Sequence, residues 1–155
     1  MLDYRWYQFD DLSARELYEI LKLRLSVFIV EQECPYPELD DLDQSAWHLT
    51  GWDENGQLMG YLRLLPPDVK YEISALGRVV TVKSARKQGI GSELMTRGIT
   101  KAEKLFPEKA IGLSAQVAAQ PFYRAMGFDA VGEMYDEDGI PHIKMIRPCG
   151  GLVDK

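Results

Sequence analysis

The strongest constraint on the fold is an apolar strand pattern that runs through a glycine-rich turn into a long amphipathic helix. Residues 77–82 are rich in β-branched side chains and mostly apolar, which is typical of a buried central strand. From Gly89 to Phe106, apolar residues recur along one side of a helix. Both elements need partners that cover them, so the sequence predicts an α/β domain.

Shorter patterns on both sides of this unit predict the remaining elements. Ser13 and Glu16 form a capping box, in which hydroxyl and carboxylate satisfy free amides at a helix start. Gly127 suits the left-handed end of another helix. The expected elements are strand 4–9, helix 13–30, strands 46–52, 57–65 and 77–82, helix 89–106, strand 111–115, helix 119–126, and strands 130–135 and 142–147. This β-α-β-β-β-α-β-α-β-β order predicts a mixed sheet.

Composition narrows the class of protein. With 155 residues, 46% of them hydrophobic and 27% charged, the chain fits a single globular domain spanning 1–155. Two cysteines are too few for a disulfide framework or a structural zinc site. A net charge of −6 argues against nucleic acid as the main partner. No apolar run approaches the ~20 residues of a membrane span and no signal peptide opens the chain, so we expect a cytoplasmic protein that acts on small molecules.

The turn at residues 86–92 has the features of an anion site. Gly89 and Gly91 let the backbone approach a ligand, and the first-turn amides of the following helix point outward. Together with the helix dipole and two adjacent cations, they suit a pyrophosphate. A dinucleotide fingerprint would need a third glycine where Leu94 stands, and no P-loop Lys-Ser/Thr follows. The alternative is an ordinary strand-to-helix turn.

Three segments in this order resemble the Gcn5-related N-acetyltransferases, the GNAT superfamily. They are Arg24-x-x-Val27-Phe28-x-x-Glu31-Gln32, Arg86-x-x-Gly89-x-Gly91 and Ala119-x-x-x-Tyr123-x-x-x-Gly127-Phe128. Two further segments are similar to the ElaA-like branch of this superfamily, namely Val30-Glu31-Gln32-x-Cys34-Pro35-Tyr36 and Gly139-Ile140-Pro141-His142-Ile143. The resemblance covers nearly the whole chain.

The resemblance implies a twisted, mostly antiparallel sheet that splits into a V between the central strand and the strand at 111–115. A bulge in the central strand would free backbone amides for the pantetheine arm and the thioester carbonyl of acetyl-CoA. The residues that it assigns to the cofactor are Val79, Val80, Thr81, Arg86, Lys87, Gln88, Gly89, Ile90, Gly91, Ser92, Gln116 and Tyr123. Gln116 departs from the asparagine that many members carry there, which puts one side-chain contact in doubt.

The implied reaction moves an acetyl group from acetyl-CoA to a primary amine, by direct attack in a ternary complex without a metal. Tyr123 is expected to protonate the departing sulfur, and Glu31 is the candidate base for the acceptor amine. The acceptor is expected to be a cationic small molecule or peptide of unidentified structure, and a homodimer is one option for the assembly. Two alternatives stay open: a non-catalytic acyl-CoA sensor and an enzyme similar to acyl-homoserine lactone synthases.

Other residues with chemistry to offer receive different interpretations. His48 and His142 are interpreted as structural rather than catalytic or metal-binding, and Cys34 as packed rather than as an acyl-accepting nucleophile. The acidic residues after the first helix form either a solvated loop or a rim that attracts a cationic acceptor. They are Glu31, Glu33, Glu38, Asp40, Asp41 and Asp43.

Overall fold

The order of elements in the structure is the predicted one. The structure is a computed structural model that describes residues 1–149. Its main elements are β1 (Asp3–Gln8), α1 (Ala14–Arg24), β2 (Trp47–Trp52), β3 (Leu58–Leu65), β4 (Ser74–Thr81), α2 (Ile90–Leu105), β5 (Ile111–Gln116), α3 (Gln120–Arg124), β6 (Asp129–Glu137) and β7 (Ile140–Arg147). Within residues 1–149, no helix is long and apolar enough to cross a membrane.

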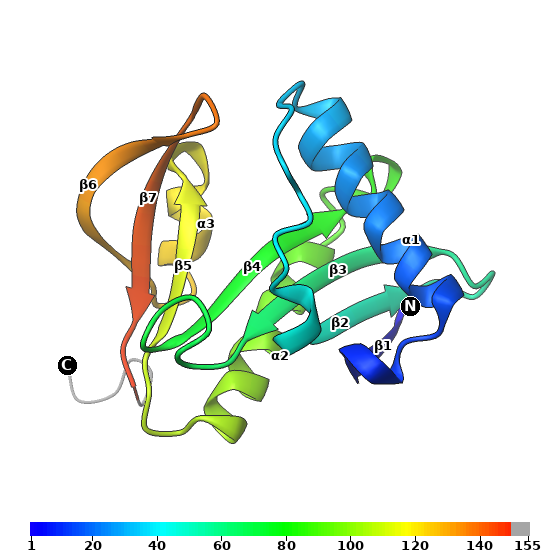
Figure 1. Ribbon diagram of the computed structural model, residues 1–155, viewed down its shortest axis with the longest axis horizontal. Helices are drawn as coiled ribbons and strands as arrows, with labels where there is room; N and C mark the ends of the chain where they lie inside the picture. Colours follow the sequence, from blue (N-terminus) through cyan, green and yellow to red (C-terminus); the bar gives the residue numbers. More distant parts are fainter. Residues whose placement is uncertain (150–155) are drawn as a thin grey trace.

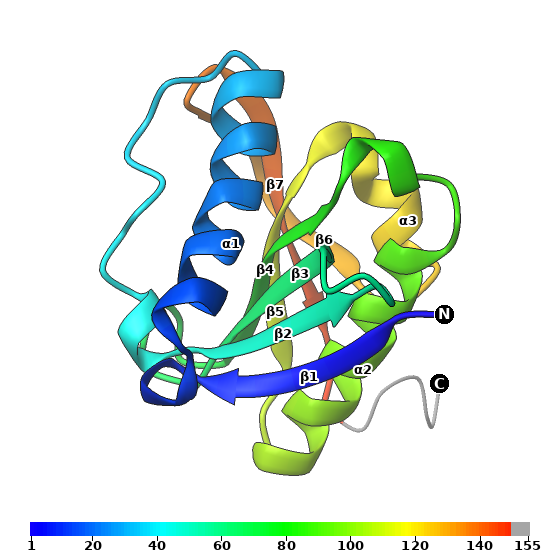
Figure 2. The same ribbon diagram turned by 90° about the vertical axis from the view of Figure 1, so that its right-hand side faces the viewer.

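The strands form one seven-stranded sheet in the order β1-β2-β3-β4-β5-β7-β6. The β4–β5 pair is parallel, and the other five neighbouring pairs are antiparallel. Helix α1 covers one face of the sheet, while α2 and α3 lie on the opposite face (Figure 2). The mixed, mostly antiparallel sheet of the sequence prediction is confirmed.

The sheet splits between β4 and β5. These strands pair only at Ser74 with Ile111 and Ala75 with Gly112, and then diverge into a V (Figure 1). Strand β5 keeps its other partner, β7, along its whole length. Within the described chain, the edge of β4 beyond Ala75 therefore has no strand on the β5 side, which confirms the predicted V.

A β-bulge interrupts β4 at the opening of the V. Tyr61 of β3 faces Val80 and Arg63 faces Gly77, so one residue between them on β3 is opposed by two on β4, Arg78 and Val79. Arg78 has a φ of +53°, in the left-handed region that side chains other than glycine seldom adopt. The predicted bulge is confirmed, and it turns the Arg78 side chain out of the regular strand alternation.

Two cores fix the sheet from its opposite faces. Helix α2 buries Leu94, Met95 and Ile99 on one face. Helix α1 buries Ile20 and Leu23 in a second core on the other face. The close fit of α2 holds the glycine-rich turn in place, because that turn leads directly into its first residue.

The helices differ from the prediction in detail. The first one ends as an α-helix at Arg24 and continues to Glu31 as a π-helical segment, Leu25–Glu31. Such segments often occur at functional sites. Helix α3 covers only five residues of the predicted 119–126, after a single 3₁₀ turn (Val117–Ala119). Gly127 has a φ of +93°, as its expected role as a left-handed stop requires.

Candidate active site

A cleft with a volume of about 400 Å³ lies at the opening of the V. Strands β4 and β5 form its walls, the π-helical segment and residues 32–36 cover one end, and the starts of α2 and α3 border the other. The cleft is therefore built from distant parts of the chain, from Val27 to His142, that meet where the sheet splits.

The glycine-rich turn has the open backbone that an anion site needs. Gly89 caps the N-terminus of α2 with a φ of +82°, and a Cβ there would meet nothing within 4 Å. A Cβ on Gly91 would only touch the Phe122 ring, at 3.8 Å. Unpaired amides at the start of a sixteen-residue helix face this space, so the turn fits a diphosphate.

The predicted cofactor residues fall into two groups. Those that line the cleft are Val79, Val80, Thr81, Arg86, Gly91, Gln116 and Tyr123. The others lie in the turn or the first helical turn beside it; they are Lys87, Gln88, Gly89, Ile90 and Ser92. Ile90 is 8% exposed and packs into the core, so only its backbone is available to a ligand.

Glu31, the predicted base, is held by the predicted phosphate ligand Arg86. The two guanidinium nitrogens of Arg86 donate to the Glu31 carboxylate over 2.5 and 2.7 Å. This hydrogen bonding lowers the pKa of Glu31, which makes its carboxylate a weaker proton acceptor. Its role as the base stays a prediction, and the structure shows a competing use for the carboxylate.

Tyr123 lies on α3 and lines the cleft. Its ring packs edge-on against Phe122 and Phe128, with centroids 5.0 and 6.2 Å away. Within residues 1–149 its hydroxyl makes no hydrogen bond, and burial raises the pKa of Tyr123 to about 12. The hydroxyl is therefore protonated at neutral pH and free to donate.

His142 lies in the cleft, where it can take part in catalysis, although its position at a strand start indicated only a structural role. Its side chain lines the cleft, and its Nδ1 lies 2.8 Å from the carbonyl oxygen of Ile140. A carbonyl only accepts hydrogen bonds, so Nδ1 carries a proton and the neutral ring has its lone pair on Nε2. Nε2 lies 3.5 Å from Oε2 of Glu137. The sequence signal for this position is the Gly139–Ile143 segment, which by itself indicates only the family resemblance.

His48 has the structural role that was expected of it. It is fully buried, its Nε2 donates to the carbonyl of Asp43 at 2.9 Å, and its Nδ1 accepts from the Tyr61 hydroxyl at 2.5 Å. Burial lowers the pKa of His48 and keeps the ring neutral. Within the described chain, no group of three or more potential metal ligands is found.

Cys34 is unsuited to nucleophilic catalysis. Its thiol donates to the carbonyl of Asp138 over 2.9 Å, which joins the segment after α1 to the β6–β7 turn. Burial, together with the charges of Asp138 and Asp136, raises the pKa of the thiol. A raised pKa disfavours the thiolate that would attack an acyl group.

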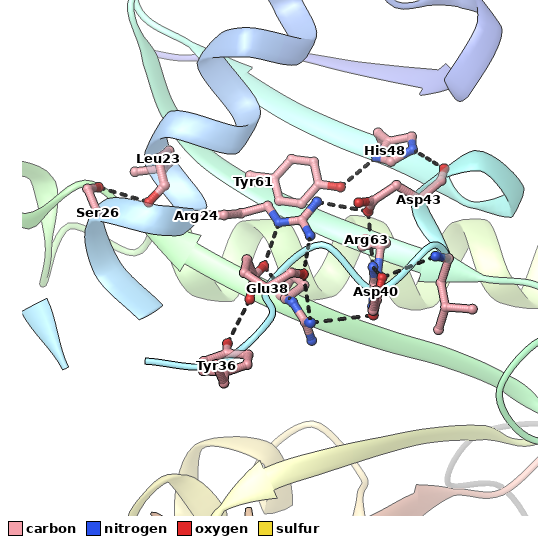
Figure 3. Close-up of polar contacts among 12 residues, drawn as sticks. Leu23, Arg24, Ser26, Tyr36, Glu38, Asp40, Asp43, His48, Tyr61 and Arg63 are labelled. Atoms are coloured by element: carbon pink, nitrogen blue, oxygen red, sulfur yellow. Dashed lines mark hydrogen bonds and ion pairs between the residues drawn. The ribbon is translucent and has the colours of Figure 1, made fainter. Parts of the chain in front are cut away.

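Glu38, Asp40 and Asp43 correct the sequence interpretation of the acidic residues after α1, whereas Glu33 and Asp41 are exposed, as expected for a solvated loop. Glu38 and Asp43 are 2% and 7% exposed, so they are neither a solvated loop nor a rim. Arg24, fully buried, donates to Glu38 at 2.7 Å and to Asp43 at 2.8 Å, as Figure 3 shows. Two more arginines complete a set that we call the arginine cluster; its members are Arg24, Arg63, Arg78, Glu38, Asp40 and Asp43.

The family of the chain follows from comparison with known proteins. A sequence model described as an Acetyltransferase (GNAT) domain matches residues 13–148. The chain belongs to the GNAT family. Its structure is similar to an acyl-CoA N-acyltransferase from Pseudomonas aeruginosa, with 46% identity, a TM-score of 0.90, and 95% of this chain and 99% of that chain covered.

Two further solved structures extend the comparison. ElaA of Escherichia coli is 38% identical, with a TM-score of 0.89 over 95% of this chain and 99% of that chain. An aminoglycoside 6′-N-acetyltransferase, solved as a complex with coenzyme A, has a TM-score of 0.71 over 97% and 99% of the two chains; at 16% identity it shares the fold alone. The GNAT chain described here is thus an acyltransferase that uses an acyl-CoA donor, and its likeness to ElaA is confirmed.

Proposed function

We propose that this acyltransferase moves an acetyl group from acetyl-CoA to a primary amine, by direct attack within a ternary complex in the cytoplasm. The observation that carries the proposal is the unpaired edge of β4 at the bulge, which faces a cleft with a diphosphate-sized turn at one end and the Tyr123 hydroxyl nearby. A bound acetyl-CoA supplies the activated acyl group.

In this proposal the backbone does most of the binding. Amides of the turn at 86–92 hold the diphosphate, and Arg86 adds positive charge beside it while it keeps its ion pair with Glu31. Edge N–H groups at Val79–Thr81 hold the pantetheine arm and stabilise negative charge on the thioester oxygen. These groups have no competing strand on that side, so no hydrogen bond of the sheet must break before they bind.

During transfer, a C–N bond to the acceptor replaces the C–S bond, the amine loses a proton, and the sulfur leaves as a thiolate. A free thiol has a pKa of about 8.5, roughly 3.5 units below that of Tyr123. Complete proton transfer from Tyr123 is therefore uphill. We assign Tyr123 a hydrogen bond to the departing sulfur, and solvent supplies the proton that the thiolate takes up.

We assign His142 as the base that removes the proton from the acceptor amine. Its Nε2 carries the lone pair in the neutral ring. The Glu137 carboxylate, 3.5 Å away, would stabilise the imidazolium that forms. Glu31 is the competing candidate from the sequence, and its ion pair with Arg86 counts against it. Because Glu38, Asp40 and Asp43 are engaged in the arginine cluster, the carboxylates that would attract an incoming ammonium are the ones that line the cleft, Glu137 and Asp138 in addition to Glu31.

The experiment is a screen for coenzyme A release with acetyl-CoA and a panel of amines, run beside acetyl-CoA thermal shifts. We expect release that depends on one class of amine. A protein that binds acetyl-CoA but releases no thiol with any amine would be the non-catalytic sensor.

The best acceptor then separates the two candidate bases. His142→Asn keeps an N–H donor for Ile140 but removes the basic nitrogen, so turnover should fall by roughly 10²- to 10⁴-fold and lose its dependence on an ionising base. Glu31→Gln should retain the wild-type pH profile. The reverse result would return the role to Glu31.

A further inference from the structure

Arg78 presents one free donor to the cleft. Its Nε donates to Glu38 at 2.7 Å, and its Nη2 donates to the Glu38 carbonyl and to Asp40 at 3.3 and 3.4 Å. Its Nη1 bonds to no residue in the described chain, although the side chain is only 19% exposed and lines the cleft. Arg78 lies in the bulge with a backbone φ of +53°. Its free Nη1 is therefore held at the cleft at some cost in backbone strain.

A side cavity of about 60 Å³ continues the cleft past Arg78, toward the end where β4 and β5 still pair. The two spaces share Gly77, Arg78, Ser114 and Glu137 among their lining residues. The cations that line the side cavity are Arg63, Lys70 and Arg78. A small group attached to a molecule in the cleft can therefore enter a space lined by positive charge.

Arg63 adds an independent sign of a missing oxygen. Its side chain is 2% exposed, and its Nε is the one buried side-chain donor or acceptor in residues 1–149 that has no hydrogen-bond partner. Buried donors are nearly always satisfied, and an exception calls for a water or an anion. Arg63 is one of the residues that line the side cavity.

The charges around the side cavity balance, so its preference depends on which hydrogen-bond donors remain free. Three arginines and three carboxylates of the arginine cluster cancel. Outside the cluster, Lys70 adds one positive charge to the side cavity, and Glu137, shared with the cleft, lies 3.5 Å from His142. The donors that remain are Nη1 of Arg78 and the Lys70 ammonium, which suit an anionic oxygen, whereas His142 and Glu137 in the cleft suit an amine.

We propose that the acceptor is a primary amine that also carries a carboxylate, an amino acid or a short peptide with a free C-terminus, and that the side cavity beside Arg78 and Lys70 binds this carboxylate. This rests on the proposed function and names the substrate class for the same cleft. The carboxylate accepts a hydrogen bond from the free Nη1 of Arg78 and lies beside the Lys70 ammonium, and its binding there would point the amine toward His142.

The test compares acceptors that differ only in the anionic group. Amino acids and dipeptides are assayed beside their C-terminal amides, which keep size and shape but lose the charge. We expect the acids to have kcat/KM values about 10- to 100-fold higher, because the amides leave charged donors unpaired. The dipeptide arm shows whether a peptide C-terminus is accepted as well as a free amino acid.

Two variants place the effect at the side cavity. Lys70→Gln should raise KM for the acids several-fold and leave KM for the amides unchanged. Lys144→Gln is the matched control, because Lys144 contacts the same Tyr71 ring as Lys70 but lines neither space. It should change neither class.

The outcomes separate this inference from the proposed function. Equal turnover of acids and amides would overturn the carboxylate site and leave the acetyltransferase proposal intact. So would equal effects of Lys70→Gln and Lys144→Gln. Acetyl-CoA binding without amine-dependent thiol release by any compound would overturn the proposed function, and the carboxylate site with it.

Discussion

The arginine cluster and the cleft are neighbours that differ in whether their polar groups have partners within the chain. In the cluster, six charged side chains form ion pairs with one another at 2.7 to 3.4 Å, and the three arginines are between 0 and 19% exposed. In the cleft, the β4 edge, the start of α2 and the Tyr123 hydroxyl have no partners in the described chain. The cluster holds the fold together, and the cleft keeps its donors for a ligand.

The difference has a simple energetic basis. A buried charge without a partner costs several kcal/mol, so charges that serve the fold must be paired within the chain. A donor that serves a substrate must be held by packing instead, since an internal partner would compete with the ligand. Arg78 belongs to both regions, with one edge paired in the cluster and one facing the cleft.

The largest expected effect comes from breaking the cluster. Asp43 accepts from both Arg24 and Arg63, at 2.8 and 3.0 Å, so Asp43→Asn leaves two buried arginines short of a counter-charge. We expect the free energy of unfolding to fall by about 3–5 kcal/mol in urea titrations. Asp41→Asn, the same change on an exposed residue of this segment, should stay within about 0.5 kcal/mol. Equal stability of the two variants would mean that the cluster does not hold the fold.

The cleft should respond to the loss of a hydroxyl in rate rather than stability. Tyr123→Phe should slow acetyl transfer by about 10²- to 10³-fold, or about 2.7–4 kcal/mol, with unchanged acetyl-CoA binding. Tyr36→Phe makes the same change beside the cluster, where the hydroxyl donates to buried Glu38 at 2.7 Å. It should cost about 1–3 kcal/mol of stability. Thermal unfolding and single-turnover rates measure both.

Because burial raises the pKa of Tyr123 to about 12, the wild-type rate should show no limb from this group between pH 7 and 10. If Tyr123→Phe turned over within about threefold of wild type under rate-limiting chemistry, the hydroxyl would be a packing feature. The Tyr123 hydroxyl would then serve the fold, as the polar groups of the cluster do, and not the reaction.

Substitutions at two glycines distinguish the cost of backbone strain from the loss of a ligand contact. Gly89 and Gly56 have φ values of +82° and +78°, and a Cβ on either would meet nothing within 4 Å. Valine at each should cost a similar ~1–2 kcal/mol, because both positions require the left-handed region. Only Gly89→Val should also abolish the thermal shift given by acetyl-CoA. Retained affinity in that variant would disprove the diphosphate assignment.

The smallest effect is a pH dependence from His48, next to the cluster. Burial lowers the pKa of His48 below the ~6.5 of the unfolded chain. Below pH 6.5 the unfolded state therefore binds a proton at His48 while the folded state does not, which favours unfolding. Stability should be unaffected above about pH 6.5 and should fall by at most about 1.4 kcal/mol between pH 6.5 and 5.5. Urea titrations at these values test it, and His48→Gln should remove this contribution. Stability that rises on acidification would contradict the assignment.

The parts of the fold that the sequence predicted correctly depend on near neighbours in the chain. In the capping box, the Glu16 amide donates to the Ser13 hydroxyl at 3.0 Å and the Ser13 amide donates to Glu16 at 2.8 Å. The left-handed Gly127 and the element order follow from similarly local patterns. The V and the bulge came from family resemblance, because a split in a sheet leaves no periodicity of its own.

The sequence by itself thus determined the order of elements, the glycine-rich turn and the family. Only the tertiary structure decided what the charged residues do. Arg63 reaches Asp40 across 23 residues, and Arg86 reaches Glu31 across 55. A run of acidic residues looks the same in a solvated loop and in a buried ion network, because the difference lies in cations that strand register brings from elsewhere in the chain. The proton position on His142 was likewise decided by the turn that brings the Ile140 carbonyl to Nδ1.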